Sequence, residues 1–285
     1  MGLTICDENQ RRASVLVTPI RPDTSKSYQS AFVPSLILER FCSNGSLTAY
    51  MSTETYANPY SVAAAGASER ALFIRRTYIH VAMAILAFVG LEAVLWRIPS
   101  VVSFANAIYG KPLIFLGAWM GISWLANSMA YSQKSKGVQY LGLGLYTVFL
   151  AIIMMPMMMY AHYQFPGQDL LTKAAFMTLS IVAGITTVAF VTKKDFSFLG
   201  PIVMIGGFIA LGMIVCGMLF GFNLGLWFSV GMVVLMAASI LHTSSNMIHN
   251  YGTDQYIGAA LALFSSIAMM FWYILRILMS LASSD

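Results

Sequence analysis

Residues 256–281 read YIGAALALFSSIAMMFWYILRILMSL and contain one charged side chain, Arg276. A helix needs about 20 apolar residues to cross the hydrocarbon core of a membrane, so this stretch is long enough to span one. Gly258, Ala262 and Ser266 follow one another at four-residue spacing. Small residues on one face let helices approach closely within a bilayer. We therefore expect this last span to lie in the interior of a helical bundle.

Six further apolar runs precede this span. The seven runs together predict an all-α integral membrane protein, a seven-transmembrane-helix bundle with the seventh helix buried. The composition agrees, because 58% hydrophobic and 9% charged residues lie outside the range usual for soluble proteins. The six expected spans are Tyr78 to Ile98, Pro112 to Tyr131, Tyr140 to His162, Thr172 to Thr192, Phe198 to Phe220 and Leu224 to Ile248.

Residues 1–70 are mixed polar sequence, and we expect a disordered N-terminal tail ahead of a membrane domain at residues 71–285. The sequence from Met51 resembles a natural start. Residues 1–50 therefore have two open interpretations, as translated sequence or as an over-extended start. A mitochondrial presequence is a third interpretation, but such peptides are poor in acidic residues, whereas this segment contains Asp7, Glu8, Asp23 and Glu39.

The net charge of +5 is better explained by membrane topology than by nucleic acid, since no basic stripe with interleaved aromatics is present. Cytoplasmic loops are enriched in Lys and Arg. Seven basic residues near the span ends lie on the side of the N-terminus and three on the other, which predicts a cytoplasmic N-terminus. The seven are Arg70, Arg75, Arg76, Lys134, Lys136, Lys193 and Lys194, and the three are Arg97, Lys111 and Lys173.

Catalytic and metal-binding patterns are absent from the sequence. The three cysteines are far apart and form no CxxC pair, which argues against disulfides and a zinc site. There is no Ser-His-Asp set, HExxH motif, phosphate-binding loop or dinucleotide fingerprint. We therefore expect a protein that is not an enzyme and that has no cofactor and no bound metal.

Several motifs resemble those of one membrane-protein family. KKDFSFLGP (193–201) resembles the signature of the Bax inhibitor-1 family, in its bacterial YccA-like branch. FIRRTYIH (73–80) is similar to the family's approach to its first helix and QYLGLGLY (139–146) to its third. ILHTSSNMIH (240–249) resembles its sixth-helix motif, and YIGAALALF (256–264) with LRIL (275–278) resembles its seventh. The resemblance covers about residues 71–281.

The resemblance implies six helices around a central seventh, a role in stress protection, and a pH-sensitive calcium leak attributed to two aspartates on helices six and seven. Thr243 and Ser266 stand at those two positions here. Two carboxylates in a low-dielectric bundle titrate as a coupled pair, and calcium prefers several oxygens with net negative charge. Hydroxyls neither titrate nor balance a divalent charge, so a leak driven by such a pair is not expected.

His242, Asn246 and His249 share one face of the sixth span at four- and three-residue steps. Polar residues in a span face the bundle interior, a neighbour or water. The set is therefore either a pore or switch lining, or a polar helix end bonded to its neighbours. An imidazole titrates near physiological pH, and protonated His242 would hinder cations in the first case.

Glu92 lies well inside the first span, and Asp195 lies in the loop that resembles the family signature. Glu92 has two open interpretations, as a cation or proton site or as an interfacial carboxylate paired with Arg97. For Asp195 we expect a capping role at the start of the fifth span.

The leading hypothesis is a multi-pass protein of a bacterial inner membrane that tunes calcium-type ion permeability or membrane homeostasis without the aspartate pair. Its partners would then be the lipid bilayer and calcium or protons, with no nucleic acid. The alternative is a non-conducting adaptor that modulates another membrane protein, such as a quality-control protease, as YccA-like relatives are thought to do.

Overall fold

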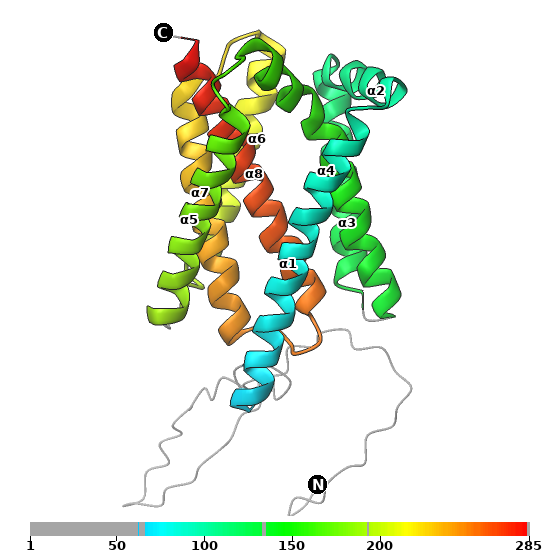
Figure 1. The fold of residues 1–285 in the computed structure, drawn as a ribbon. Helices are drawn as coiled ribbons and strands as arrows, with labels where there is room; N and C mark the ends of the chain where they lie inside the picture. Colours follow the sequence, from blue (N-terminus) through cyan, green and yellow to red (C-terminus); the bar gives the residue numbers. More distant parts are fainter. Residues whose placement is uncertain (1–61, 63–65, 133–134, 193, 284–285) are drawn as a thin grey trace, which may run out of the picture. The chain divides into compact units, whose positions relative to one another are not determined.

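The computed structural model describes residues 62, 66–132, 135–192 and 194–283. These residues form eight α-helices and no strand (Figure 1). The helices are α1 (Ala67–Leu95), α2 (Pro99–Tyr109), α3 (Pro112–Ala130), α4 (Lys136–Gln164), α5 (Leu170–Thr192), α6 (Leu199–Phe220), α7 (Gly225–His249) and α8 (Tyr256–Ala282). The expected tail lies outside the described residues except for Val62 and residues 66–70, and so does the segment before Met51.

Seven of these helices are long and apolar enough to cross a membrane, namely all except α2. Each corresponds to one predicted span, so the predicted number and order of spans are confirmed. The first helix begins at Ala67, eleven residues before the predicted span. The added turns contain Ala, Glu and Arg, which have high helix propensity, so the helix continues beyond the part that is apolar enough for the membrane.

The sequence did not predict α2. Ile98 and Pro99 stand in a stretch that resembles a turn, but Pro99 is the first residue of the helix. Proline is favoured at that position because its missing N–H would have no intrahelical partner there. With 11 residues, α2 is too short to cross a bilayer. It lies at the end of the bundle where α8 ends, here called the α2 end (Figure 1), and packs on α4 and α3.

The last span lies in the interior of the bundle, as predicted. α8 packs against α1, α3, α4, α5 and α7, and its buried side chains include Phe264, Met270 and Leu275. By contrast, α6 packs mainly on α7 and buries little more than Ala210. α6 is therefore the peripheral span and α8 the central one.

Glycines allow two of the closest contacts between helices. A Cβ atom on Gly258 would lie 2.6 Å from a ring carbon of Tyr131, so the start of α8 fits against the end of α3. A Cβ atom on Gly142 would lie 2.8 Å from the backbone oxygen of Ala126. Because that neighbour is backbone and cannot rotate away, α3 and α4 can pack at this distance only with glycine in α4.

The end of the bundle where α1 begins, here called the α1 end, is closed by contacts between connecting segments. Val62 is fully buried, and its N–H donates to the carbonyl of Tyr251 between α7 and α8, at 2.8 Å. Its own carbonyl accepts from Nε of Arg70, at 3.2 Å. Ordered packing therefore begins before residue 71.

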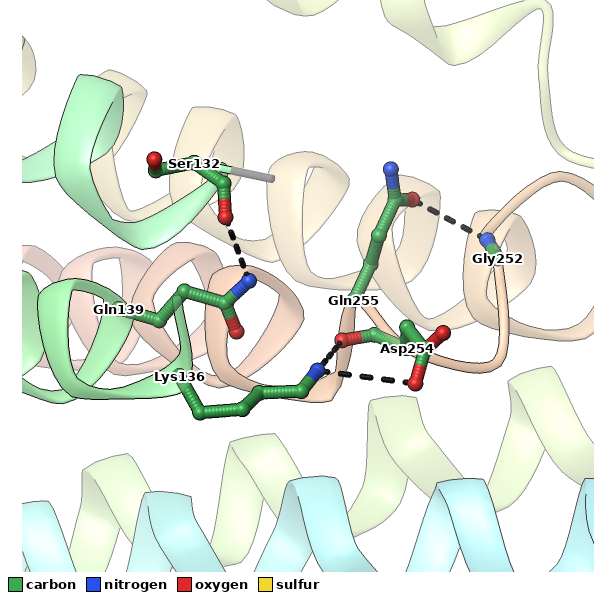
Figure 2. A network of polar contacts seen from close by, with 6 residues as sticks. All are labelled: Ser132, Lys136, Gln139, Gly252, Asp254 and Gln255. Atoms are coloured by element: carbon green, nitrogen blue, oxygen red, sulfur yellow. Dashed lines mark hydrogen bonds and ion pairs between the residues drawn. The ribbon is translucent and has the colours of Figure 1, made fainter. Parts of the chain in front are cut away.

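Figure 2 shows a second set of contacts at the α1 end. Nζ of Lys136 donates to the backbone oxygen of Asp254 at 2.7 Å and lies 3.6 Å from its carboxylate. Nε2 of Gln139 donates to the carbonyl of Ser132, at 2.7 Å. The ion pair is largely exposed, and exposed pairs contribute about 0–1 kcal/mol. The part-buried bond of Gln139, which joins α4 to the segment after α3, is therefore the firmer of the two contacts.

Candidate functional site

A pair of serines links α7 to the central helix α8. The hydroxyl of Ser239 lies 3.0 Å from the hydroxyl of Ser266, which also donates to the carbonyl of Ala262 at 3.1 Å. Ser266 is 7% exposed and Thr243 is 8% exposed. The partner of Ser266 across the helices is thus Ser239, one helical turn before Thr243, a residue that the sequence motifs did not single out. The signal available was its spacing, since residues four apart share a helix face.

Further neutral hydroxyls join α8 and α7 to their other neighbours. The hydroxyls of Tyr146 on α4 and Ser265 on α8 lie 2.9 Å apart. Those of Tyr78 on α1 and Ser244 on α7 lie 3.5 Å apart, which is long for a bond between hydroxyls. The polar groups that connect these helices in the bundle interior are therefore hydroxyls, which carry no charge at physiological pH.

The loop between α5 and α6 is bonded to α7 near the α1 end. The hydroxyl of Ser245 accepts from the N–H of Phe196 at 2.9 Å and donates to the carbonyl of Lys194 at 3.3 Å. Nδ1 of His242 lies 3.3 Å from the carbonyl of Phe196. We call these four residues the α7 clasp. It holds the segment that resembles the family signature against the segment that resembles the sixth-helix motif.

The bonds around His242 define its tautomer. Nδ2 of Asn250 donates to Oδ1 of Asn246, at 2.9 Å. The amide nitrogen of Asn246 is thereby directed at Nε2 of His242, 2.9 Å away. Since an amide nitrogen only donates, these contacts fit the tautomer with its proton on Nδ1, donated to the carbonyl of Phe196.

Gly200 provides the space for the imidazole of His242. A Cβ atom at Gly200 would lie 2.9 Å from Cε1 of His242, so any side chain there would displace the ring or the loop. His242 and Asn246 share a face, as the spacing predicted. His249 is bonded separately, through Nδ1 to the carbonyl of Ser245 at 3.0 Å. A pore lining by these three residues stays a prediction, since their described bonds are those of a helix end tied to its neighbours.

Asp195 does not cap α6, contrary to expectation. The N-cap is Phe198, which makes no side-chain cap bond. Asp195 stands three residues earlier, and Oδ1 instead accepts from the N–H of Ser197 at 2.9 Å and from its hydroxyl. Short side chains at such positions form turns with the residue two further on. These two bonds from Ser197 lower the pKa of the Asp195 carboxyl below its ordinary value.

Glu92 lies towards the α2 end, away from the α7 clasp. It is 5% exposed, and Oε2 accepts from Nε1 of Trp96 at 2.8 Å. Oε1 is buried without a hydrogen-bond partner. The expected alternative of a pair with Arg97 is wrong, since the one ion pair among the described residues joins Lys136 to Asp254. Trp96 reaches the carboxylate because it is four residues away on the same helix face.

No cluster of three or more His, Cys, Asp or Glu side chains that could hold a metal ion occurs in the described part of the chain. The candidate site described above comprises the Ser239–Ser266 pair with Thr243, and the α7 clasp. The structure brings His242, Asn246 and Asp195 to the same region around the α5–α6 loop, and leaves Glu92 separate.

Comparison with known proteins agrees with this architecture. A family model described as "Inhibitor of apoptosis-promoting Bax1" matches residues 70–283. LIFEGUARD 4 of Arabidopsis thaliana is 29% identical over 72% of this chain and 83% of its own length. An uncharacterized protein of Neisseria meningitidis serogroup A is 27% identical, over 64% of this chain and 82% of its own.

A further bacterial relative covers a smaller region. An uncharacterized protein of Pseudomonas aeruginosa is 34% identical over 39% of this chain, and the match spans half of that protein's length. The family match extends over the whole helical bundle, from the first turns of α1 to the end of α8. The chain therefore belongs to the Bax inhibitor-1 family of multi-pass membrane proteins, to which the LIFEGUARD proteins also belong.

Proposed function

We propose that the protein tunes the calcium-type ion permeability of its membrane, or its homeostasis, without a titrating aspartate pair. The observation that carries the proposal is the hydrogen bond between Ser239 and Ser266. It joins α7 to the central helix at Ser266, one of the two positions where the family resemblance implies a carboxylate; Thr243, the other, lies one helical turn from Ser239. Membership of the family also agrees with the prediction that the chain is not an enzyme, because these are generally non-enzymatic membrane proteins.

The chemistry of these positions supports a permeability that does not change with pH, because no side chain there gains or loses a proton. Carboxylates in a low-dielectric interior repel one another when both are ionised, so their protonation changes how the helices pack. The hydroxyls of Thr243 and Ser266 keep the same charge and the same bonding capacity at any physiological pH. Opening of the α7–α8 contact would then depend on helix rearrangement alone.

The orientation and membrane of the protein form part of the proposal. The α1 end carries Arg75, Arg76 and Lys136, and cytoplasmic span ends are rich in such residues. We therefore place the N-terminus in the cytoplasm. Relatives from Pseudomonas and Neisseria support a bacterial inner membrane, and the motifs quoted above favour the YccA-like branch.

The proposal is tested by calcium uptake into liposomes that contain the purified full-length chain, compared with protein-free liposomes. Uptake above that of the protein-free liposomes is expected. A Ser239→Ala variant should raise it, because the link between α7 and α8 is weakened. Uptake equal to that of protein-free liposomes for both chains would rule the function out.

A second function is an adaptor that binds another membrane protein, such as a quality-control protease. The observation that favours it is the one-sided packing of α6. This helix packs mainly on α7 and leaves Phe208, Ile209 and Leu219 exposed. Copurification of a stable partner, lost when Phe208 and Ile209 are both replaced by Ala, would support the adaptor. Copurification of the same partner with this double variant would contradict a role for this face of α6.

A further inference from the structure

A cavity of about 650 Å³ opens between α2, α4 and α8 at the α2 end of the bundle. Its size lies within the range of ligand sites in proteins, about 300–1,000 Å³. The lining includes Asn106 and Tyr109 from α2, Tyr160 from α4, and Trp272 and Arg276 from α8. None of the residues that line it is acidic, so the cavity combines one positive charge with several hydrogen-bond donors.

Arg276 has no acidic partner among the described residues. Its neighbours in the cavity include the phenol of Tyr109 and the indole of Trp272, neither of which is acidic enough to pair with it. An arginine in a membrane helix costs free energy unless it is paired or reaches the interface. Its guanidinium remains charged and matches the planar spacing of two phosphate or carboxylate oxygens. The ligand that this side chain is suited to bind is therefore an anion.

The position of Arg276 along α8 indicates where that anion lies. Six residues separate it from the end of the helix at Ala282, or about 9 Å at a rise of 1.5 Å per residue. This depth places the guanidinium near the level of lipid headgroups when α8 spans the bilayer. The short helix α2 lies at the same end (Figure 1) and forms one side of the cavity. Trp272 and the methionines of α4 form an apolar side.

We propose that this cavity binds a phosphate group, held by Arg276 and by the side-chain donors Asn106 and Tyr160. The phosphate belongs either to a phospholipid headgroup or to a free phosphate ion. The apolar side favours the phospholipid, because the glycerol and the first carbons of an acyl chain would lie against Trp272. The site is separate from the Ser239–Ser266 pair and from the α7 clasp, so it does not depend on the proposed permeability function.

The test uses the full-length chain, freed of lipid in dodecyl maltoside, which carries no phosphate. Tryptophan fluorescence is followed while dihexanoyl phosphatidylglycerol, inorganic phosphate or an uncharged monoacylglycerol is added. We expect saturable binding of the phosphatidylglycerol and none of the monoacylglycerol. Saturation by inorganic phosphate at similar concentrations would assign the site to a free ion. Saturation by neither phosphate compound would overturn the proposal.

Variants connect the binding to Arg276. Arg276→Gln should weaken it about tenfold to a hundredfold, since hydrogen bonds to a charged group are lost. Arg276→Lys should retain part of the affinity, because it keeps the charge but not the planar pair of donors. Arg97→Gln is the matched control, as Arg97 is exposed at the same end and does not line the cavity. Equal affinity in Arg276→Gln and Arg97→Gln would contradict the assignment.

A second route avoids any effect of the Arg276 variants on folding. Asn106 is exposed on α2 and lines the cavity, so Asn106→Trp should fill the site without disturbing the packed core. Loss of phosphatidylglycerol binding in this variant, with an unchanged elution volume in gel filtration, supports the site. Unchanged binding would place the phosphate elsewhere.

Discussion

The hydroxyl of Ser239 on α7 lies 3.0 Å from the hydroxyl of Ser266 on α8. Ser266 is thus held from two sides, by Ser239 and by the carbonyl of Ala262 in its own helix. Both hydroxyls are uncharged and can donate and accept, so the hydrogen bond between α7 and the central helix needs no ion and no ionised side chain. Four changes test this contact and three others, namely the approach of α3 to α4, the turn at Asp195 and the bond of Glu92 to Trp96.

Replacing Ser239 by Ala removes the bond to α7 and leaves Ser266 bonded to Ala262. Hydrogen bonds between membrane helices contribute about 0.6 kcal/mol on average and up to about 1.7 kcal/mol. We expect a loss of that size in the free energy of unfolding, measured by denaturant titration in detergent micelles. Ser283→Ala is the control, since the hydroxyl of Ser283 donates to the nearby carbonyl of Ser280 and joins no second helix. An equal loss of unfolding free energy in Ser283→Ala and Ser239→Ala would show that the Ser239–Ser266 bond makes no specific contribution to stability.

Gly142→Ala should destabilise the contact between α3 and α4. The added Cβ would lie 2.8 Å from the carbonyl oxygen of Ala126, which belongs to the backbone, so the helices must separate. Overpacking of this kind costs about 1–3 kcal/mol. Thermal unfolding in detergent measures it, and Gly144→Ala is the matched control because its Cβ would meet nothing within 4 Å. Equal midpoints for the two variants would contradict the close approach.

The stability of the turn made by Asp195 and Ser197 should decrease as the pH falls. The pKa of its carboxyl is lowered in the folded chain by the two bonds from Ser197. Its contribution is therefore complete above the unfolded value, about 3.9, and is lost as pH falls through the lower folded value. Hydrogen exchange of the N–H of Ser197 should be slower in the wild type than in Asp195→Ala at pH 6. This difference should shrink only below pH 4, and a difference lost already at pH 5 would refute the assignment.

Glu92→Gln tests whether the buried carboxylate is only a partner of Trp96. The amide oxygen of Gln can accept the same bond from the indole N–H, and a neutral group costs less to bury than a charged one. We expect the variant to unfold at the same temperature as the wild type or higher, while Glu92→Ala unfolds lower because the indole loses its partner. An unchanged stability together with an altered calcium or proton flux in Glu92→Gln would instead favour the ion-site interpretation.

The sequence predicts the seven spans and the central last helix because both depend on the composition and spacing of residues within each span. The apolar runs set the number of spans, and the small residues Gly258 and Ser266 mark the buried face. α2 escaped prediction because an 11-residue helix has no membrane-length run, and because Pro99 is as compatible with a turn as with a helix start. The early start of α1 at Ala67 was missed because helicity does not require burial in the membrane.

Side-chain partners could be predicted only where they lie on one helix. The shared face of His242 and Asn246 follows from their spacing. The bond of Ser266 to Ser239, and that of Ser245 to the α5–α6 loop, depend on the register between separate elements, which no local pattern specifies. The partner of Glu92 was misassigned because Arg97 and Trp96 both lie within reach in sequence. Four-residue spacing directs Trp96 at the carboxylate, whereas five-residue spacing turns Arg97 away from it.

The most direct test of the central claim is calcium flux into liposomes at pH 6 and pH 8, with the wild type beside the double variant Thr243→Asp, Ser266→Asp. The hydrogen bond between Ser239 and Ser266 is neutral, so the wild type should give the same rate at both pH values. The double variant should give a rate that changes with pH, because carboxylates placed in a low-dielectric bundle interior take up protons as the pH falls. A wild-type rate that changes with pH as much as the variant's would contradict the account.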